Sequence, residues 1–157
     1  MRVLLARAAL AIMAAATSVA IAAAPDPVIG TWQLSAAKST FTAGPAIKSQ
    51  TRTYSQSGNE ITLVMKSTGA DGKEVATKTT YQLNGKDFPV TGSPDYDSLS
   101  ATQVDSNAAR FTLKKAGKAV GTTTRTVSKD GKMLTSTSKM TTAKGEMSEN
   151  VLVFDKE

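Results

Sequence analysis

The chain has 157 residues, of which 40% are hydrophobic and 20% are charged. This length and balance are typical of one globular domain. The sequence contains no histidine and no cysteine. The absence of histidine excludes a Ser-His-Asp triad and zinc or haem held by histidine. The absence of cysteine excludes thiol chemistry, cysteine-held iron–sulfur clusters and disulfide bonds.

The first 24 residues differ from the rest of the chain. Arg2 and Arg7 supply positive charge, and the remainder is almost entirely apolar or small and ends in alanines. A basic start, an apolar centre and a small-residue end are the parts of a secretory signal peptide. The apolar run is too short and too weakly hydrophobic to suit a permanent membrane span. We therefore expect residues 1–24 to be a signal peptide, leaving a single periplasmic or secreted domain over residues 25–157 with no stable membrane insertion.

Lysine and arginine outnumber aspartate and glutamate by 19 to 13. Two of the basic residues belong to the expected signal peptide, and the lysines beyond it are scattered along the chain. A nucleic-acid-binding surface concentrates basic residues in a patch or stripe, so we expect no nucleic-acid partner. Scattered lysines suit solvated strand faces, where they discourage edge-to-edge pairing.

Hydrophobic residues alternate with polar ones through most of the chain after residue 25, as in half-buried strands. Ile61, Leu63 and Met65, for example, share one face of such a segment. Asn-Gly, Asp-Gly and similar pairs separate the segments and favour tight hairpins, because these turns need a positive φ. The pattern predicts strands over residues 28–34, 49–56, 60–67, 74–83, 98–104, 109–115, 119–128, 132–141 and 146–154.

Consecutive hairpins give an all-β, antiparallel, up-and-down meander. A meander of about eight or more strands closes on itself or divides into two sheets, and closure removes the exposed edges. We therefore predict a closed up-and-down barrel of about 8–10 strands, with a β-sandwich and a flat, partner-binding meander as alternatives. Two segments interrupt the pattern. Residues 35–48 suit one helical turn and a loop, and residues 87–97, with two prolines, suit an irregular crossing.

The opening Gly30-Thr31-Trp32 resembles the Gly-x-Trp start of lipocalins and fatty-acid-binding proteins. In those barrels the tryptophan plugs the closed end, and a basic residue from a late strand packs on it. The last strand here lacks the Arg-x-Tyr pair that holds a fatty-acid carboxylate in those families. More of the chain is similar to small exported bacterial proteins described as lipocalin-like, for which no activity is established. The similar segments are 30–34, 37–41, 50–54, 85–95, 128–132 and 151–156.

Four residues are candidates for contact with a ligand. Arg52 and Tyr54 share one face of a predicted strand, and an inward face would let guanidinium and phenol hold a carboxylate or sulfate. An outward Arg52 would instead be solvated or ion-paired. Trp32 suits the core at the closed end, with ligand contact as the alternative. For Arg125 three alternatives remain. Its side chain stacks on Trp32, contacts a ligand, or lies on the surface.

Three function classes remain open for this sequence. The first is a barrel that binds a small hydrophobic or amphipathic molecule, and the second is a structural or stress-related envelope protein with a packed interior. An enzyme is the third and least favoured, because no catalytic pairing emerges. Small Thr, Ser and Ala side chains with 5% aromatics favour an interior cavity. We expect no cofactor and no metal, since Asp95 and Asp97 lack the remaining ligands of a calcium loop. The oligomeric state is open.

Overall fold

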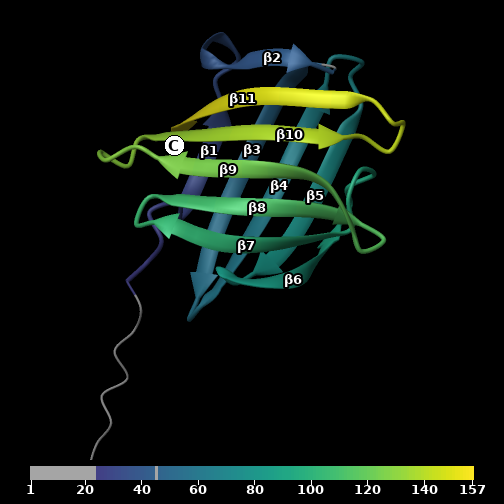
Figure 1. Ribbon diagram of the computed structural model, residues 1–157. Coiled ribbons are helices and arrows are strands. Elements are labelled where there is room, and N and C mark those ends of the chain that lie inside the picture. The colour runs from purple at the N-terminus through teal and green to yellow at the C-terminus, as the bar shows by residue number, and fades with distance from the viewer. Residues whose placement is uncertain (1–23, 45) are drawn as a thin grey trace, which may run out of the picture.

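The computed structural model describes residues 24–44 and 46–157. The expected signal peptide therefore lies outside the described residues, apart from Ala24. Within these two ranges, eleven strands and one 3₁₀ turn follow in chain order (Figure 1). No helix in the described ranges is long and apolar enough to cross a membrane. The elements are β1 (Gly30–Leu34), η1 (Ala36–Lys38), β2 (Thr40–Ala43), β3 (Ile47–Ser57), β4 (Glu60–Gly69), β5 (Glu74–Tyr81), β6 (Asn84–Thr91), β7 (Ser98–Asp105), β8 (Ala108–Lys115), β9 (Lys118–Val127), β10 (Met133–Thr141) and β11 (Met147–Lys156).

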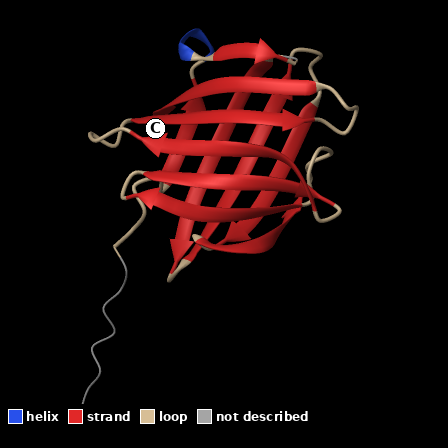
Figure 2. Cartoon of the chain, in the orientation of Figure 1, coloured by secondary structure: helices blue, strands red, loops and turns tan. Residues whose placement is uncertain are grey.

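The strands form a closed antiparallel barrel. Each strand from β3 to β10 pairs with the next in sequence, and β1 pairs with both β3 and β11. Trp32 lies opposite Lys156 and Leu34 opposite Phe154 in the pairing that closes the ring. The prediction of a closed meander is confirmed. Strands β3 to β5 cross steeply behind β7 to β11 (Figures 1 and 2), so the inward faces of two layers enclose the interior.

Strand β2 continues the ring where β1 ends. The chain leaves β1, makes the η1 turn and returns beside the other half of β11, with Phe41 opposite Asn150. Together β1, η1 and β2 act as one interrupted strand along β11. The helical turn expected within residues 35–48 is therefore confirmed, whereas most of the expected loop after it is strand.

The alternating sequence pattern places its faces as predicted. On β5, Thr77, Thr79 and Tyr81 are buried, while Glu74 and Lys78 between and beside them are exposed. Successive side chains of a strand point to opposite faces, so the buried set faces the interior. Threonine suits this half-buried position because its branched side chain packs well on a pleated surface.

The expectation of an irregular crossing over residues 87–97 is wrong for its first half, which belongs to β6. The side chain of Asn84 accepts a hydrogen bond from the Lys86 amide at 3.0 Å, so the local turn chemistry is present. It produces a bulge in the pairing with β7, after which the chain remains in the sheet. Pro89 is tolerated here because β6 pairs with β5 at two positions only, which leaves few ladder hydrogen bonds to lose.

Candidate functional site

Trp32 closes one end of the barrel. Its side chain is 0% exposed, and its Nε1 donates a hydrogen bond to the carbonyl oxygen of Val28 at 2.6 Å. Lys156 of β11 holds its Nζ 5.0 Å from the centroid of the Trp32 ring. Lys156 is therefore the late-strand basic residue that the lipocalin resemblance implies. Trp32 itself does not line the interior cavity described below.

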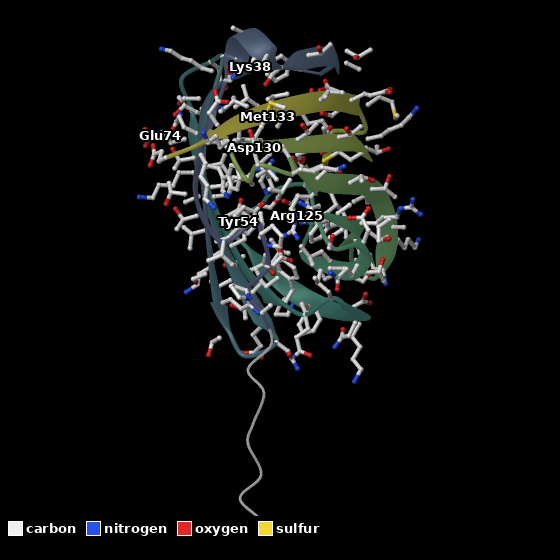
Figure 3. All side chains as sticks on the ribbon, turned by 90° about the vertical axis from the view of Figure 1, so that its left-hand side faces the viewer. Lys38, Tyr54, Glu74, Arg125, Asp130 and Met133 are labelled. Atoms are coloured by element: carbon white, nitrogen blue, oxygen red, sulfur yellow. The ribbon has the colours of Figure 1, made fainter. Side chains whose placement is uncertain are left out.

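Arg125 packs inside the barrel, and its guanidinium lies over the rings of Tyr54 and Phe111 instead of the ring of Trp32. The structure thus replaces the expected stacking on Trp32 by an ion pair, since Arg125 Nη2 lies 2.9 Å from Asp26 Oδ2. Arg125 Nη1 donates to the hydroxyl of Tyr81 at 2.9 Å. The guanidinium carbon lies 5.7 Å from the Tyr54 ring centroid, and Figure 3 shows these two side chains together in the interior.

Burial and charge set the ionisation of this cluster. Burial raises the pKa of the Tyr81 phenol well above its ordinary value, and the nearby Arg125 offsets part of the rise. Burial also acts to lower the pKa of Arg125, but Tyr81, Tyr54 and Asp26 outweigh it and raise that pKa. Arg125 is therefore a fixed cation whose charge Asp26 already neutralises.

A cavity of about 300 Å³ occupies the interior beyond Arg125. One side of its wall is apolar and includes Leu63 and Met65 of β4, Leu99 of β7 and Leu113 of β8. The other side comes from β9, β10 and β11 and carries mainly small hydroxyl and amide side chains. These small residues leave the interior partly empty, because an inward face that filled a barrel would carry larger side chains.

Arg52 points inward and lines this cavity, so the outward alternative is wrong. Its side chain is 9% exposed, and its Cζ lies 4.4 Å from the Phe154 ring centroid. The Nε donates to Gln50 Oε1 at 2.7 Å, and Gln50 Nε2 in turn donates to Ser67 Oγ at 2.6 Å. Among the described residues no carboxylate pairs with Arg52, and its two Nη groups donate no hydrogen bond.

The two Nη groups of Arg52 therefore present free donors to the cavity. Tyr54 follows two residues later on the same inward face and also lines the space. The structure thus brings together Arg52, Tyr54 and Arg125 of the four candidates and leaves Trp32 at the closed end. A buried cation that forms no ion pair, in a partly apolar cavity, favours an anion beside it.

Tyr96 also belongs to the site, although no sequence pattern indicates it. It lies in the loop between β6 and β7 and lines the cavity. Burial raises the pKa of its phenol, and the neighbouring positive charge of Arg52 acts in the opposite direction. A tyrosine in an irregular, proline-containing segment has no periodic pattern that would orient it, so its inward position could not be read from spacing.

The loop that carries Tyr96 is tied across one end of the barrel. Asp95 Oδ1 accepts a hydrogen bond from the Ala143 amide in the β10–β11 turn at 2.9 Å. Asp97 Oδ2 accepts one from the Ala116 amide in the β8–β9 turn at 2.9 Å. The backbone hydrogen bond from Ala116 is the main reason that the pKa of Asp97 lies below its ordinary value. The two carboxylates thus fasten residues 93–97 to two neighbouring turns.

The structure offers no geometry for a metal centre in the residues it describes. No group of three or more Asp and Glu side chains lies close enough to hold an ion there. Asp95 and Asp97 are engaged by backbone amides of different turns.

No protein-family model and no curated protein matches the sequence. Solved structures match at low identity. Rv2717c from M. tuberculosis has a TM-score of 0.50 at 14% identity and covers 83% of this chain and 93% of its own. A redesigned beta barrel, mFAP1, bound to DFHBI has a TM-score of 0.48 at 16% identity, covering 83% and 95%. Zebrafish ileal bile acid-binding protein complexed with cholic acid has a TM-score of 0.47 at 12% identity, covering 83% and 99%.

These likenesses concern the fold alone. The barrel itself confirms the distant resemblance to lipocalin and fatty-acid-binding barrels that the Gly-x-Trp start indicates. The ring closes through β1 and β11, Trp32 is buried at its closed end, and Lys156 packs on it.

Proposed function

We propose that this protein binds a small hydrophobic or amphipathic molecule with an acidic head group inside its barrel. The observation that carries the proposal is Arg52, a buried cation that faces a cavity and forms no ion pair with any described carboxylate. A guanidinium offers paired donors that match the two oxygens of a carboxylate or sulfonate. The proposal assigns binding to the cavity and no chemical step.

The size of the cavity indicates the size of the ligand. At roughly 30 Å³ for each water-sized group, a space of about 300 Å³ takes about ten non-hydrogen atoms. That is the lower end of the range for small-molecule sites. A medium-length alkyl acid or a compact ring acid fits this volume, and its apolar body would contact the leucines and methionine of β4, β7 and β8.

The structural alternative, a barrel packed by its own side chains, is less well supported. A packed interior leaves no voids much larger than a water molecule, whereas this one leaves about 300 Å³ beside a charged side chain. An unpaired cation in a packed core would also be costly without a partner. The cavity and Arg52 therefore favour the ligand-binding function.

We also propose that the protein acts outside the cytoplasm, in the periplasm or as a secreted protein. The support is the basic, then apolar, then small-residue pattern of residues 1–24. Intact-mass measurement of the protein from its native host should find a chain that begins between Ala23 and Pro25. Full-length protein recovered from the cytoplasm would contradict the proposal.

The binding proposal is tested by titrating decanoate into the purified protein and two variants, with calorimetry as the readout. Arg52→Ala should weaken binding at least about tenfold, because a charge-assisted contact is lost. Arg110→Ala is the matched control, since Arg110 is exposed on β8, and it should bind as the parent protein does. Native mass spectrometry of protein purified from its host should in addition show a small bound acid. An empty protein that binds no acid would support the structural alternative.

A further inference from the structure

A second polar group lies in the cavity wall, on β10 and β11 and away from Arg52. Asn150 is 9% exposed and Ser136 is 0% exposed, and both line the cavity. Asn150 Nδ2 donates to Ser148 Oγ at 3.2 Å, but Asn150 Oδ1 and Ser136 Oγ have no hydrogen-bond partner among the described residues. The next inward residue toward the closed end on each strand is apolar, Leu134 on β10 and Leu152 on β11.

Buried polar atoms without a partner are uncommon, because burial removes their hydrogen bonds to water and nothing replaces them. A purely apolar cavity would carry leucine or valine at these two positions at no such cost. Asn150 and Ser136 therefore need a partner that enters the cavity, either water or part of a ligand.

The pairing register puts the two side chains within reach of one group. Asn150 lies opposite Ser138, and Ser136 lies opposite Leu152, so Asn150 and Ser136 occupy diagonal positions of the ladder. Such positions are roughly 7–8 Å apart at the backbone. A hydroxyl between them spans two hydrogen bonds of about 2.8 Å each, donating to Asn150 Oδ1 and accepting from Ser136 Oγ.

The distance to Arg52 also restricts the ligand. Arg52 stacks on Phe154, and Asn150 lies four residues from Phe154 along β11. The hydroxyl lies midway between the position of Asn150 and that of Leu152, which is opposite Ser136. At about 3.3 Å for each residue of a strand, it is therefore roughly 10 Å from the guanidinium. An extended ten-carbon chain has a comparable length. The nearby cation Arg125 is already paired with Asp26, so this second position suits a neutral group.

We propose that the ligand is a hydroxylated amphipathic acid, whose acid group binds Arg52 and whose distant hydroxyl binds Asn150 and Ser136. This inference rests on the proposed function and adds a second polar contact to it. A ligand without the hydroxyl leaves the two polar atoms unpaired on binding, which is how sites that hydrogen-bond a hydroxyl discriminate against analogues lacking it.

The test compares decanoate with 10-hydroxydecanoate by calorimetry on the parent protein, Asn150→Leu, Ser136→Ala and Arg52→Ala. The parent protein should bind the hydroxy acid at least about tenfold more tightly than decanoate. Asn150→Leu should remove that preference, because leucine has a similar volume and no oxygen that could accept a hydrogen bond from the hydroxyl. Ser136→Ala should reduce the preference, and Arg52→Ala should weaken both acids alike. Thermal unfolding of each variant shows that it is folded.

The outcomes separate the two proposals. If both acids bind the parent protein equally well and Asn150→Leu changes neither affinity, water satisfies the two polar atoms and the hydroxyl contact is overturned, while the carrier function stands. If neither acid binds, or if Arg52→Ala binds as the parent does, the proposed function fails, and the hydroxyl contact fails with it.

Discussion

The carboxylate of Asp26 pairs with the guanidinium of Arg125 at 2.9 Å, with side chains that are 11% and 3% exposed. The pair joins the segment ahead of β1 to the interior of β9. Asp26 also caps its own segment, because its Oδ1 accepts a hydrogen bond from the Val28 amide at 2.9 Å. Val28 in turn holds Trp32. The residues before the first strand are thus part of the barrel's closed end.

Removing one member of this pair should destabilise the protein strongly. Asp26→Ala leaves Arg125 as an uncompensated buried charge, which costs about 3–5 kcal/mol. Urea unfolding followed by tryptophan fluorescence measures the change in the free energy of unfolding. The double variant Asp26→Ala/Arg125→Met is the control and should recover part of the loss, because no charge then remains buried. Equal losses in the single and double variants would contradict this account.

The hydrogen bond from Trp32 to Val28 should contribute measurably to stability. Trp32→Phe leaves the buried Val28 carbonyl without its donor, which costs about 1–3 kcal/mol. Lys156→Met keeps most of the side-chain stem but removes the charge above the ring. It should lower the free energy of unfolding by about 0.5–1 kcal/mol, which is the range for exposed cation–π contacts. Thermal and urea unfolding measure both. A larger loss of unfolding free energy for Lys156→Met than for Trp32→Phe would contradict this account, because the cation would then contribute more to the closed end than the hydrogen bond does.

Gly92 marks a close approach between the loop after β6 and strand β5. A Cβ there would collide with the Ala76 carbonyl oxygen, and the φ of Gly92 is +82°. Gly72 has a similar φ of +80° with nothing within 4 Å, so it is a matched control for backbone strain alone. Gly72→Ala should cost about 1 kcal/mol, and Gly92→Ala should cost clearly more. Equal costs would mean that the β5–β6 contact adjusts freely.

The carboxyl group of Asp97, in the loop that carries Tyr96, should titrate at a lower pH in the folded protein than in the unfolded protein. The folded-state pKa of Asp97 is lowered, chiefly by the backbone hydrogen bond from Ala116. A lowered folded-state pKa stabilises the protein at pH values above the unfolded-state pKa. This stabilisation is lost as the pH falls through the folded-state pKa. NMR should therefore show the Asp97 carboxyl titrating below the same group in urea-unfolded protein, with the Ala116 amide shift following it. In Asp97→Asn the Ala116 shift should not titrate, and a normal Asp97 pKa would contradict the prediction.

The regular part of the fold could be predicted because its signals are local. Alternation over residues 74–83 and turns such as the one at Gly131, where φ is +71°, define hairpins one at a time, and the ring follows from their sum. Strand β6 could not be found this way, because an Asn-Gly pair and a proline read as a break while the pairing with β7 holds the chain in the sheet. Tertiary pairing outweighed local preference there.

The site was predictable only in part. Arg52 and Tyr54 could be placed on one face by their spacing, but which face pointed inward depended on the whole ring. The partner of Arg125 could not be found, because Asp26 precedes the first strand and has no periodic position. Asn150 and Ser136 resemble many other polar strand residues, and only their burial without partners distinguishes them.

The closing pairs of the ring also determine when the barrel can form. Trp32 and Leu34 meet their partners only at Lys156 and Phe154 of β11, which are synthesised after the other strands of the barrel. Until then β1 can pair with β3 alone, and its other edge stays open. Closing a loop of nearly the whole chain is slow in comparison with forming each hairpin. The ring therefore closes only after β11 has been synthesised, and until then the growing chain is an open sheet that can still be unfolded hairpin by hairpin.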